Sequence, residues 1–593
     1  MNQTNSPYDL KITGGLLVDG TGSAPRKADV GIRDGKIAAV GDVSGAATQT
    51  IDASGCIVTP GFVDIHTHYD GQVSWDNDLM PSSIHGVTTV VMGNCGVGFA
   101  PVRKADRQKL IELMEGVEDI PGSVLAEGIQ WDWESFPEYM DALDRTPHAI
   151  DYAVQVPHDA LRVYVMGERA AAGTAATADD IDGMRAELRR SLQAGAVGFS
   201  TGRTDNHRAK NGSHTPGAES TAAELSGIAE AFAGLDHGVL MAVSDYDMDQ
   251  GPDKFDQEFD ILQQMAEHAD GHPLSMSVSQ RDLEPEQWRR IVTRVEQCNA
   301  NGLPMRMQVA PRGIGVLLGF ETTFHPFMGF PSYKKIAHLP LSERVEKLRD
   351  PAMRAQMLTE KNDKLAGDGS SIPPLADRML QMLDRLAFKL FRLGENPQYE
   401  PTMADSLGMA AKKRGVGALE EIYDAMLEND GKELLYFPIY NYQAFNLEMV
   451  RELLNHPLAL PGLSDGGAHA GTICDASFPT FLLTWWTRDR PTGQMKLERA
   501  VQMLTHDTAA HIGFHDRGVV QVGMKADLNV IDHANLRLHR PKLVADLPAG
   551  GRRLLQDAQG YKATIVSGQV VALDGVLTGA RPGRLVRLGQ KSA

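Results

Sequence analysis

The feature that most constrains this chain is an apolar run at residues 57–65 that leads into the pair His66 and His68. The run predicts a buried strand, in which Pro60 and Gly61 permit a kink. Side chains two residues apart on a strand point to the same side, so both imidazoles can reach one point at the strand's carboxyl end. Neutral imidazole is a common ligand of zinc-like ions, and the spacing therefore predicts a metal half-site. Two histidines on a solvated strand end remain the alternative.

Apolar strand-like runs alternate with helical segments through the middle of the chain, which predicts βα units and a parallel sheet. The candidate strands are residues 58–66, 88–94, 153–157, 196–200, 239–244, 273–279, 304–309 and 460–463. Eight such strands would close an α/β (β/α)₈ TIM-like barrel, whose chemistry lies on the loops after their carboxyl ends. Short strands with Gly/Asp turns occur at both ends of the chain, so we expect a small β-sandwich domain built from both termini.

An insertion separates the last two candidate barrel strands. A stripe at i, i+3/i+4 spacing predicts a helix that packs against the barrel, with a partner-binding surface as the less favoured alternative. It comprises Met379, Leu383, Leu386, Leu390 and Leu393. The run 434–440 is either an extra strand or a competitor of the seventh candidate. The expected domain order is 1–56 for the first part of the sandwich, 57–311 for the first part of the barrel, 312–432 for a mainly helical insertion or cap, 433–515 for the last part of the barrel, and 516–593 for the rest of the sandwich.

Charge and cysteine content narrow the partners. Lys and Arg number 58 against 77 Asp and Glu, a net charge of −19 that argues against nucleic acid or an anionic membrane as partner. No stretch approaches the ~18 apolar residues of a membrane span. The first residues lack the pattern of a signal peptide, and the four cysteines are too scattered for a disulfide framework, so we expect a cytoplasmic protein.

Two further strand ends carry groups suited to a cation. Cys95 follows the second candidate strand, where a thiolate would be a strong, soft ligand. A nucleophilic cysteine and an inert buried thiol are the alternatives. Asp465 ends the eighth candidate strand, where a carboxylate near a cation could shuttle a proton. A turn-capping role is its alternative.

These motifs, together with the stretch 523–528, resemble the amidohydrolase superfamily and within it the D-aminoacylase (N-acyl-D-amino-acid deacylase) family. The resemblance is close to full length. It implies that His66 and His68 hold the more exposed metal and that Cys95 replaces a carboxylated lysine as the metal-bridging ligand. It also implies that Asp465 touches the metal and takes the proton from the attacking water.

The chain departs from that family at strands five and six, whose ends carry histidines in the short D-aminoacylases. Here those ends, residues 241–245 and 277–280, contain none. A single ion is therefore favoured over two. Asp245, Gln280 or His207 could substitute for the missing ligands, or catalysis could be lost.

Other polar residues follow the predicted strands and are candidates for binding substrate. The resemblance implies that His158, in a segment after the third strand, lines the pocket, although it could equally be structural. Arg203 could hold a substrate carboxylate or form an ion pair. His207, in the loop after the fourth strand, and His469, after Asp465, complete the set.

The leading interpretation is a hydrolase of linear amide C–N bonds that uses a divalent metal, with zinc favoured, to activate water. Its expected substrate is a small N-acylated molecule: an N-acyl amino acid, for which the family suggests the D configuration, or a related N-acyl amine. A homo-oligomer is left open. One alternative is a degenerate barrel that only binds. Another is a serine hydrolase using Ser200 in Gly-x-Ser-x-Gly, although that motif needs a helix directly after the serine, where this sequence predicts a loop.

Overall fold

An eight-stranded parallel sheet forms the centre of the computed structural model, which describes residues 7–247, 250–251, 253–367 and 372–589. Its strand order is β18-β14-β13-β12-β11-β10-β9-β8, so neighbours in space are neighbours in sequence except across the insertion. The TIM-like barrel predicted from the sequence is confirmed. The strands are β8 (Phe62–Asp64), β9 (Val87–Met92), β10 (Asp151–Pro157), β11 (Gly198–Arg203), β12 (Val239–Ser244), β13 (Leu274–Ser277), β14 (Met305–Val309) and β18 (Ala459–Pro461).

The sheet closes just beyond the ends of its first and last strands. Thr67 forms a parallel bridge with Gly466. The backbone N–H of His68 donates to the Gly466 carbonyl at 2.7 Å, and that of Asp465 donates to the His66 carbonyl at 3.2 Å. The seam of the barrel therefore runs through the segments that carry the His-x-His pair and Asp465.

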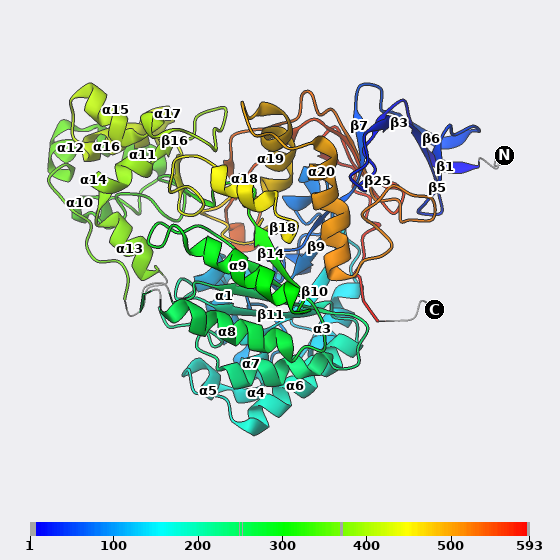
Figure 1. Cartoon of the computed structure of the whole chain (residues 1–593). Coiled ribbons are helices and arrows are strands. Elements are labelled where there is room, and N and C mark those ends of the chain that lie inside the picture. The colour runs from blue at the N-terminus through cyan, green and yellow to red at the C-terminus, as the bar shows by residue number, and fades with distance from the viewer. Residues whose placement is uncertain (1–6, 248–249, 252, 368–371, 590–593) are drawn as a thin grey trace.

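Helices cover the outside of the barrel (Figure 1). The end of one of them reaches the candidate functional site described below. The main ones are α1 (Arg107–Glu118), α2 (Gly122–Gly128), α3 (Phe136–Asp144), α4 (His158–Met166), α6 (Ala178–Gln193), α7 (Ala222–Ala229), α8 (Lys254–Glu267), α9 (Gln287–Ala300) and α18 (Glu448–Leu454). Capping boxes begin α3 and α6 at Ser135 and Thr177. Helix α1 ends at Glu118 because Asp119 adopts a left-handed conformation. Among the described residues, no helix combines the length and apolar character needed to cross a membrane.

Two smaller sheets pack face to face beside the barrel, and one of them joins the two ends of the chain. The four-stranded sheet has the order β5-β4-β1-β6, and the seven-stranded sheet has the order β26-β25-β24-β19-β7-β2-β3. Ile12 and Val30 from the first pack with Val530 and Ile565 from the second. The strands are β1 (Tyr8–Thr13), β2 (Leu16–Leu17), β3 (Arg26–Lys27), β4 (Asp29–Arg33), β5 (Lys36–Gly41), β6 (Ala47–Asp52), β7 (Ile57–Pro60), β19 (Leu528–Ile531), β24 (Tyr561–Val566), β25 (Gln569–Leu573) and β26 (Val576–Leu577).

The prediction of one barrel strand over residues 58–66 is wrong. The run divides at Gly61 into β7, which belongs to the seven-stranded sheet, and β8, which belongs to the barrel. At Gly61 a Cβ would lie 2.1 Å from Oγ1 of Thr88, so only glycine permits this close approach. The same backbone N–H donates to the Asp527 carbonyl at 2.8 Å and ties the two sheets together.

The insertion has its own three-stranded sheet, β15-β17-β16, and its own apolar core, and it forms a separate lobe beside the barrel (Figure 1). The run 434–440 supplies its strand β17, so it is an extra strand. The predicted helix over 379–393 is wrong because Met382 leaves helical geometry. The elements are β15 (Gly315–Leu318), α10 (Pro331–Lys334), α11 (Leu341–Arg349), α12 (Pro351–Met357), α13 (Pro374–Leu380), α14 (Leu383–Leu386), β16 (Phe391–Arg392), α15 (Leu407–Arg414), α16 (Ala418–Met426), α17 (Glu428–Gly431) and β17 (Leu435–Pro438). The domain limits given above stay a prediction.

Candidate metal centre

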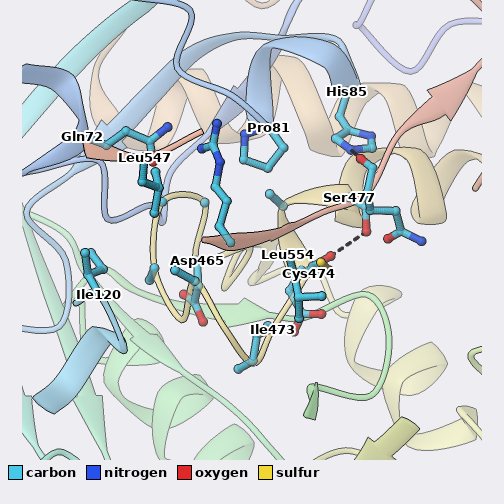
Figure 2. A pocket seen from close by; sticks show the side chains of 18 of the residues that line it. Gln72, Pro81, His85, Ile120, Asp465, Ile473, Cys474, Ser477, Leu547 and Leu554 are labelled. Carbon is cyan, nitrogen blue, oxygen red and sulfur yellow. Dashed lines mark hydrogen bonds between the residues drawn. The ribbon is translucent and has the colours of Figure 1, made fainter. Parts of the chain in front are cut away.

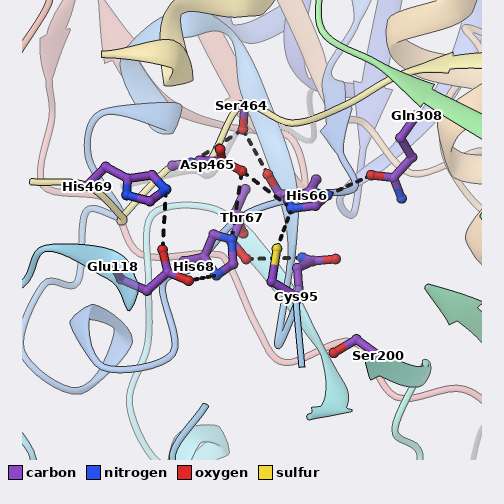
Figure 3. Close-up of polar contacts among 12 residues, drawn as sticks. His66, Thr67, His68, Cys95, Glu118, Ser200, Gln308, Ser464, Asp465 and His469 are labelled. Atoms are coloured by element: carbon purple, nitrogen blue, oxygen red, sulfur yellow. Dashed lines mark hydrogen bonds and ion pairs between the residues drawn. The ribbon is translucent and has the colours of Figure 1, made fainter. Parts of the chain in front are cut away.

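Side chains from the loops after β8, β9 and β18 meet at one buried point (Figure 3). Nε2 of His66 lies 3.3 Å from Sγ of Cys95 and 3.4 Å from Oδ1 of Asp465. Nε2 of His68 lies 3.7 Å from the same Asp465 oxygen. The ligand atoms of the two histidines and Cys95 all lie within 4.8 Å of one another. The structure thus brings together the four residues for which a ligand role was predicted.

The backbone at this point departs from regular strand geometry. The histidines lie beyond the end of β8, and Thr67 between them forms the barrel seam. Cys95 and Asp465 have φ values of 55° and 50°, a left-handed conformation that few non-glycine residues adopt. Such conformations cost about 1–3 kcal/mol and gather at functional sites, because the surrounding fold must hold them.

Each histidine of the pair is held from its outer nitrogen. Nδ1 of His66 lies 2.7 Å from Oε1 of Gln308, whose amide nitrogen in turn donates to Ser275 Oγ at 2.9 Å. Nδ1 of His68 lies 3.2 Å from Oε1 of Glu118. Groups that accept from the outer ring nitrogen leave the inner one free to bind a metal.

The sequence did not identify Gln308 and Glu118 as functional residues. Gln308 is the second-last residue of a predicted barrel strand, where its position was a usable signal. Glu118 lies in a carboxylate-bearing segment after the second predicted strand, but nothing in the sequence gave it a role.

Burial sets the protonation of the group. It lowers the pKa of His66 to about 4. Burial, followed by the charges of Asp475 and Asp64, raises the pKa of Asp465 to about 8. Burial, followed by the nearby carboxylates of Glu118 and Asp465, raises the pKa of the Cys95 thiol. Every member is therefore most stable uncharged unless a positive charge enters the group.

The unpaired atoms fit a divalent cation. Oδ1 of Asp465 and both carboxylate oxygens of Glu118 are buried and have no hydrogen-bond partner. Within the described part of the chain, these two carboxylates form ion pairs only with histidines. Nitrogen, sulfur and oxygen donors in this number and spacing match the ligand set of zinc. A cation there would offset the cost of burying the carboxylates and the thiolate.

Two more histidines lie next to this group. Nε2 of His469 is 3.6 Å from Oε2 of Glu118, and burial, followed by the charges of His207 and His66, lowers its pKa to about 3. Burial lowers the pKa of His207 to about 4. His207 also contributes to the lowered pKa of His66 and His68, which places its imidazole in the same region.

His158 and Arg203 form a different cluster. Nε2 of His158 lies 3.0 Å from Oε1 of Glu224, which also accepts a hydrogen bond from Arg162 at 2.6 Å. Arg203 donates to both carboxylate oxygens of Glu258, at 2.9 and 3.0 Å. Their contacts give no support to the predicted substrate role, because both side chains are buried and already paired.

The other predicted substitutes are also engaged. Asp245 accepts hydrogen bonds from Thr204 and from the backbone of residue 205. Gln280 donates to the Pro285 carbonyl at 3.1 Å and accepts from the backbone of residue 443 at 3.3 Å. Ser200 lies inside β11, where its hydroxyl donates to the Gly93 carbonyl and accepts from a backbone N–H. The elbow of a serine hydrolase places its serine on a turn before a helix, and Ser200 has neither.

Two cavities adjoin the active face. A narrow one has Asp465 in its wall, together with Ile120, Ile473 and Leu554 (Figure 2). The second lies between the barrel loops and the insertion. It has an empty volume of about 700 Å³ and is lined by residues that include Asp245 and Arg281 from the barrel loops and Met379, Ile439 and Tyr440 from the insertion side. The insertion therefore contributes one wall of a cavity on the face that carries the predicted chemistry.

Known proteins resemble the chain along its whole length. The family model described as "Amidohydrolase family" matches residues 49–572. D-aminoacylase of Alcaligenes xylosoxydans xylosoxydans is 29% identical over 99% of this chain and 99% of its own length. N-acyl-D-aspartate deacylase of the same organism is 27% identical, covering 98% of this chain and 95% of its own length. A solved D-aminoacylase structure, reported for its binuclear metal centre, is 25% identical with a TM-score of 0.63, covering 98% of this chain and 100% of that one.

Proposed function

The chain belongs to the amidohydrolase family, and from this premise we propose that it is a metal-dependent deacylase of N-acyl amino acids. The observation that carries the proposal is the convergence of His66, His68, Cys95 and Asp465 from three separate loops. Nothing in an ordinary barrel core requires two imidazoles, a thiol and a carboxylate this close to one another. A bound cation accounts for all four.

We propose one zinc-like ion held by these four side chains. The ion would polarise the amide carbonyl and lower the pKa of a water molecule. His66 and His68 bind through Nε2, because their Nδ1 atoms face Gln308 and Glu118. Cys95 binds as the thiolate, which the added positive charge stabilises.

Asp465 supplies proton transfer in this proposal. Its Oδ1 faces the two histidines, and the residue also lines the adjoining cavity. The carboxylate takes a proton from the attacking water and delivers it to the amide nitrogen as the C–N bond breaks. The water oxygen joins the acyl carbon, and the transferred proton leaves with the amine.

The substrate class follows from the relatives and from the cavity beneath the insertion. The similar proteins are named for deacylation of D-amino acids and N-acyl-D-aspartate. An N-acyl-D-amino acid is therefore the proposed substrate. The cavity bounded by Met379 and Ile439 offers apolar surface for an acyl group or side chain.

Chelation tests the proposal. The purified protein is assayed on matched panels of N-acetyl-D- and N-acetyl-L-amino acids, before and after treatment with a chelator and after addition of zinc. We expect deacylation of D-configured substrates that is lost on metal removal and restored by zinc. Deacylation that survives in metal-free protein would contradict the proposal, as would a metal-loaded protein that cleaves no substrate in either panel.

A further inference from the structure

Glu118 is a buried carboxylate that lies next to two histidines of the site and comes from the connection between β9 and β10. It is the last residue of α1, and only 1% of its surface is exposed. We propose that Glu118 is a positioning residue that holds the imidazole of His68 in place for metal binding. This inference rests on the proposed function, because His68 is one of the proposed ligands.

The first contact orients an imidazole. Oε1 of Glu118 lies 3.2 Å from Nδ1 of His68, and Nε2 of the same ring faces Asp465 at 3.7 Å (Figure 3). A carboxylate next to Nδ1 favours the tautomer that carries its proton there and leaves the Nε2 lone pair for a metal. Gln308 does the same for His66 with a neutral amide. The two ligand histidines are thus held by acceptors of different charge, and the carboxylate makes its imidazole the more basic ligand.

The second contact fixes the loop that carries Asp465. Oε2 of Glu118 lies 3.6 Å from Nε2 of His469, and the Glu118 carbonyl accepts the backbone N–H of His469 at 2.5 Å. Both Asp465 and His469 have left-handed backbone conformations, with φ values of 50° and 49°. A strained segment of this kind needs anchors at its ends to stay in one conformation.

A purely structural role accounts poorly for this carboxylate. Neither of its oxygens has a hydrogen-bond partner, and among the described residues its ion pairs are with His68 and His469 only. An ionised carboxylate buried without a cationic partner is costly, and an apolar side chain of similar size would pack there at lower cost. The acid at this position therefore serves the imidazoles.

The next residue provides a matched control. Asp119 accepts hydrogen bonds from the backbone N–H of Gly471 at 3.1 Å and from the Thr472 hydroxyl at 3.2 Å. It ties the same loop to the same end of α1, yet these contacts include no imidazole. A variant of Asp119 therefore removes loop anchoring and leaves the His68 contact intact.

The experiment measures zinc affinity by competition with a chromophoric chelator in wild type, Glu118→Gln, Glu118→Leu and Asp119→Ala. Thermal unfolding of the metal-free proteins is followed in parallel to verify that each variant folds. We expect zinc binding to weaken about 100-fold in Glu118→Leu and about 10-fold in Glu118→Gln, which keeps an oxygen acceptor but loses the charge. Asp119→Ala should stay within about twofold of wild type, because the contacts of Asp119 involve no ligand histidine.

The outcomes separate this inference from the function on which it rests. A wild-type protein that binds no zinc would overturn the proposed function. Wild-type affinity in folded Glu118→Gln and Glu118→Leu would overturn the positioning role and leave the proposed function standing. An equal loss in Asp119→Ala and Glu118→Leu would also overturn it, since loop anchoring alone would then explain the effect.

Discussion

Two groups of buried polar side chains at the ends of the barrel strands balance their charge in opposite ways. The cation cluster contains carboxylates and imidazoles without arginine or lysine, and comprises His66, His68, Cys95, Glu118 and Asp465. The arginine cluster pairs each carboxylate with a guanidinium, and comprises His158, Arg162, Glu224, Arg203 and Glu258. Both are composed of residues that look functional in the sequence.

The contrast appears in the pKa of one glutamate from each cluster. Burial would raise the pKa of Glu224, but the hydrogen bond and charge of His158, followed by those of Arg162, lower it to about 2. Burial raises the pKa of Glu118 well above its ordinary value, and the charge of Asp465 adds to this. The arginine cluster is electrostatically complete within the chain, whereas the cation cluster is complete only with a cation. Buried carboxylates that lack a cationic partner among the described residues, rather than the presence of histidine, distinguish the proposed binding site from the arginine cluster.

The largest expected effect belongs to Asp465→Asn. The amide cannot accept the proton from water, so we expect kcat to fall by about 10²- to 10⁴-fold with the fold intact. Steady-state kinetics on the best N-acyl substrate measures the loss, and circular dichroism checks the fold. Near-normal turnover would remove Asp465 from its assigned role.

Breaking the other cluster should cost stability instead. In Arg162→Met the Glu224 carboxylate stays buried without its guanidinium, and we expect a loss of about 3–5 kcal/mol in the free energy of unfolding. Urea denaturation of the metal-free protein measures this, and zinc stoichiometry should not change. Loss of the metal in this variant would show that the two clusters are not separate.

The dependence of stability on acidic pH tests the same difference between the two clusters. The folded-state pKa of Glu224 lies below its ordinary value of 4.5, so its contribution is fully present above that pH. It is lost as pH falls from 4.5 towards 2, and amounts to about 3 kcal/mol. The stability difference between wild type and Glu224→Gln should therefore shrink between about pH 5 and pH 2, the range over which the unfolded and then the folded Glu224 gain a proton. A constant difference across that range would contradict the assignment.

Ser200→Ala should have the smallest effect. Its hydroxyl binds backbone groups of Gly93 and Gly96 and touches neither cluster's charged atoms. We expect stability to fall by about 1 kcal/mol and kcat to stay within about twofold of wild type. Complete loss of turnover in a folded variant would revive the serine alternative.

The sequence predicted the site where strand ends carry it. His66, His68, Cys95 and Asp465 all follow barrel strands, so topology alone brings them to one face. Glu118 escaped because it ends a helix, and only tertiary packing brings it to His68. The sequence also gave no indication of which buried charged residues pair with one another.

Local backbone geometry accounts for the errors in the fold. The apolar run 57–65 carries no sign that Gly61 passes it from one sheet to another. The stripe over 379–393 is buried for the most part, but short segments supply it in place of one helix. The spacing of apolar residues predicts which side chains are buried better than it predicts the type of element that carries them. The ion pair of Arg203 could not be predicted either, because its partner Glu258 lies on a helix far along the chain.

The central claim is that loops after the first, second and last barrel strands hold one cation. Elemental analysis of the purified wild type and of His66→Ala/His68→Ala, prepared side by side, tests it most directly. The account predicts about one zinc-like ion per chain in the wild type and none in the double variant. Metal content that is unchanged in a folded double variant would contradict it.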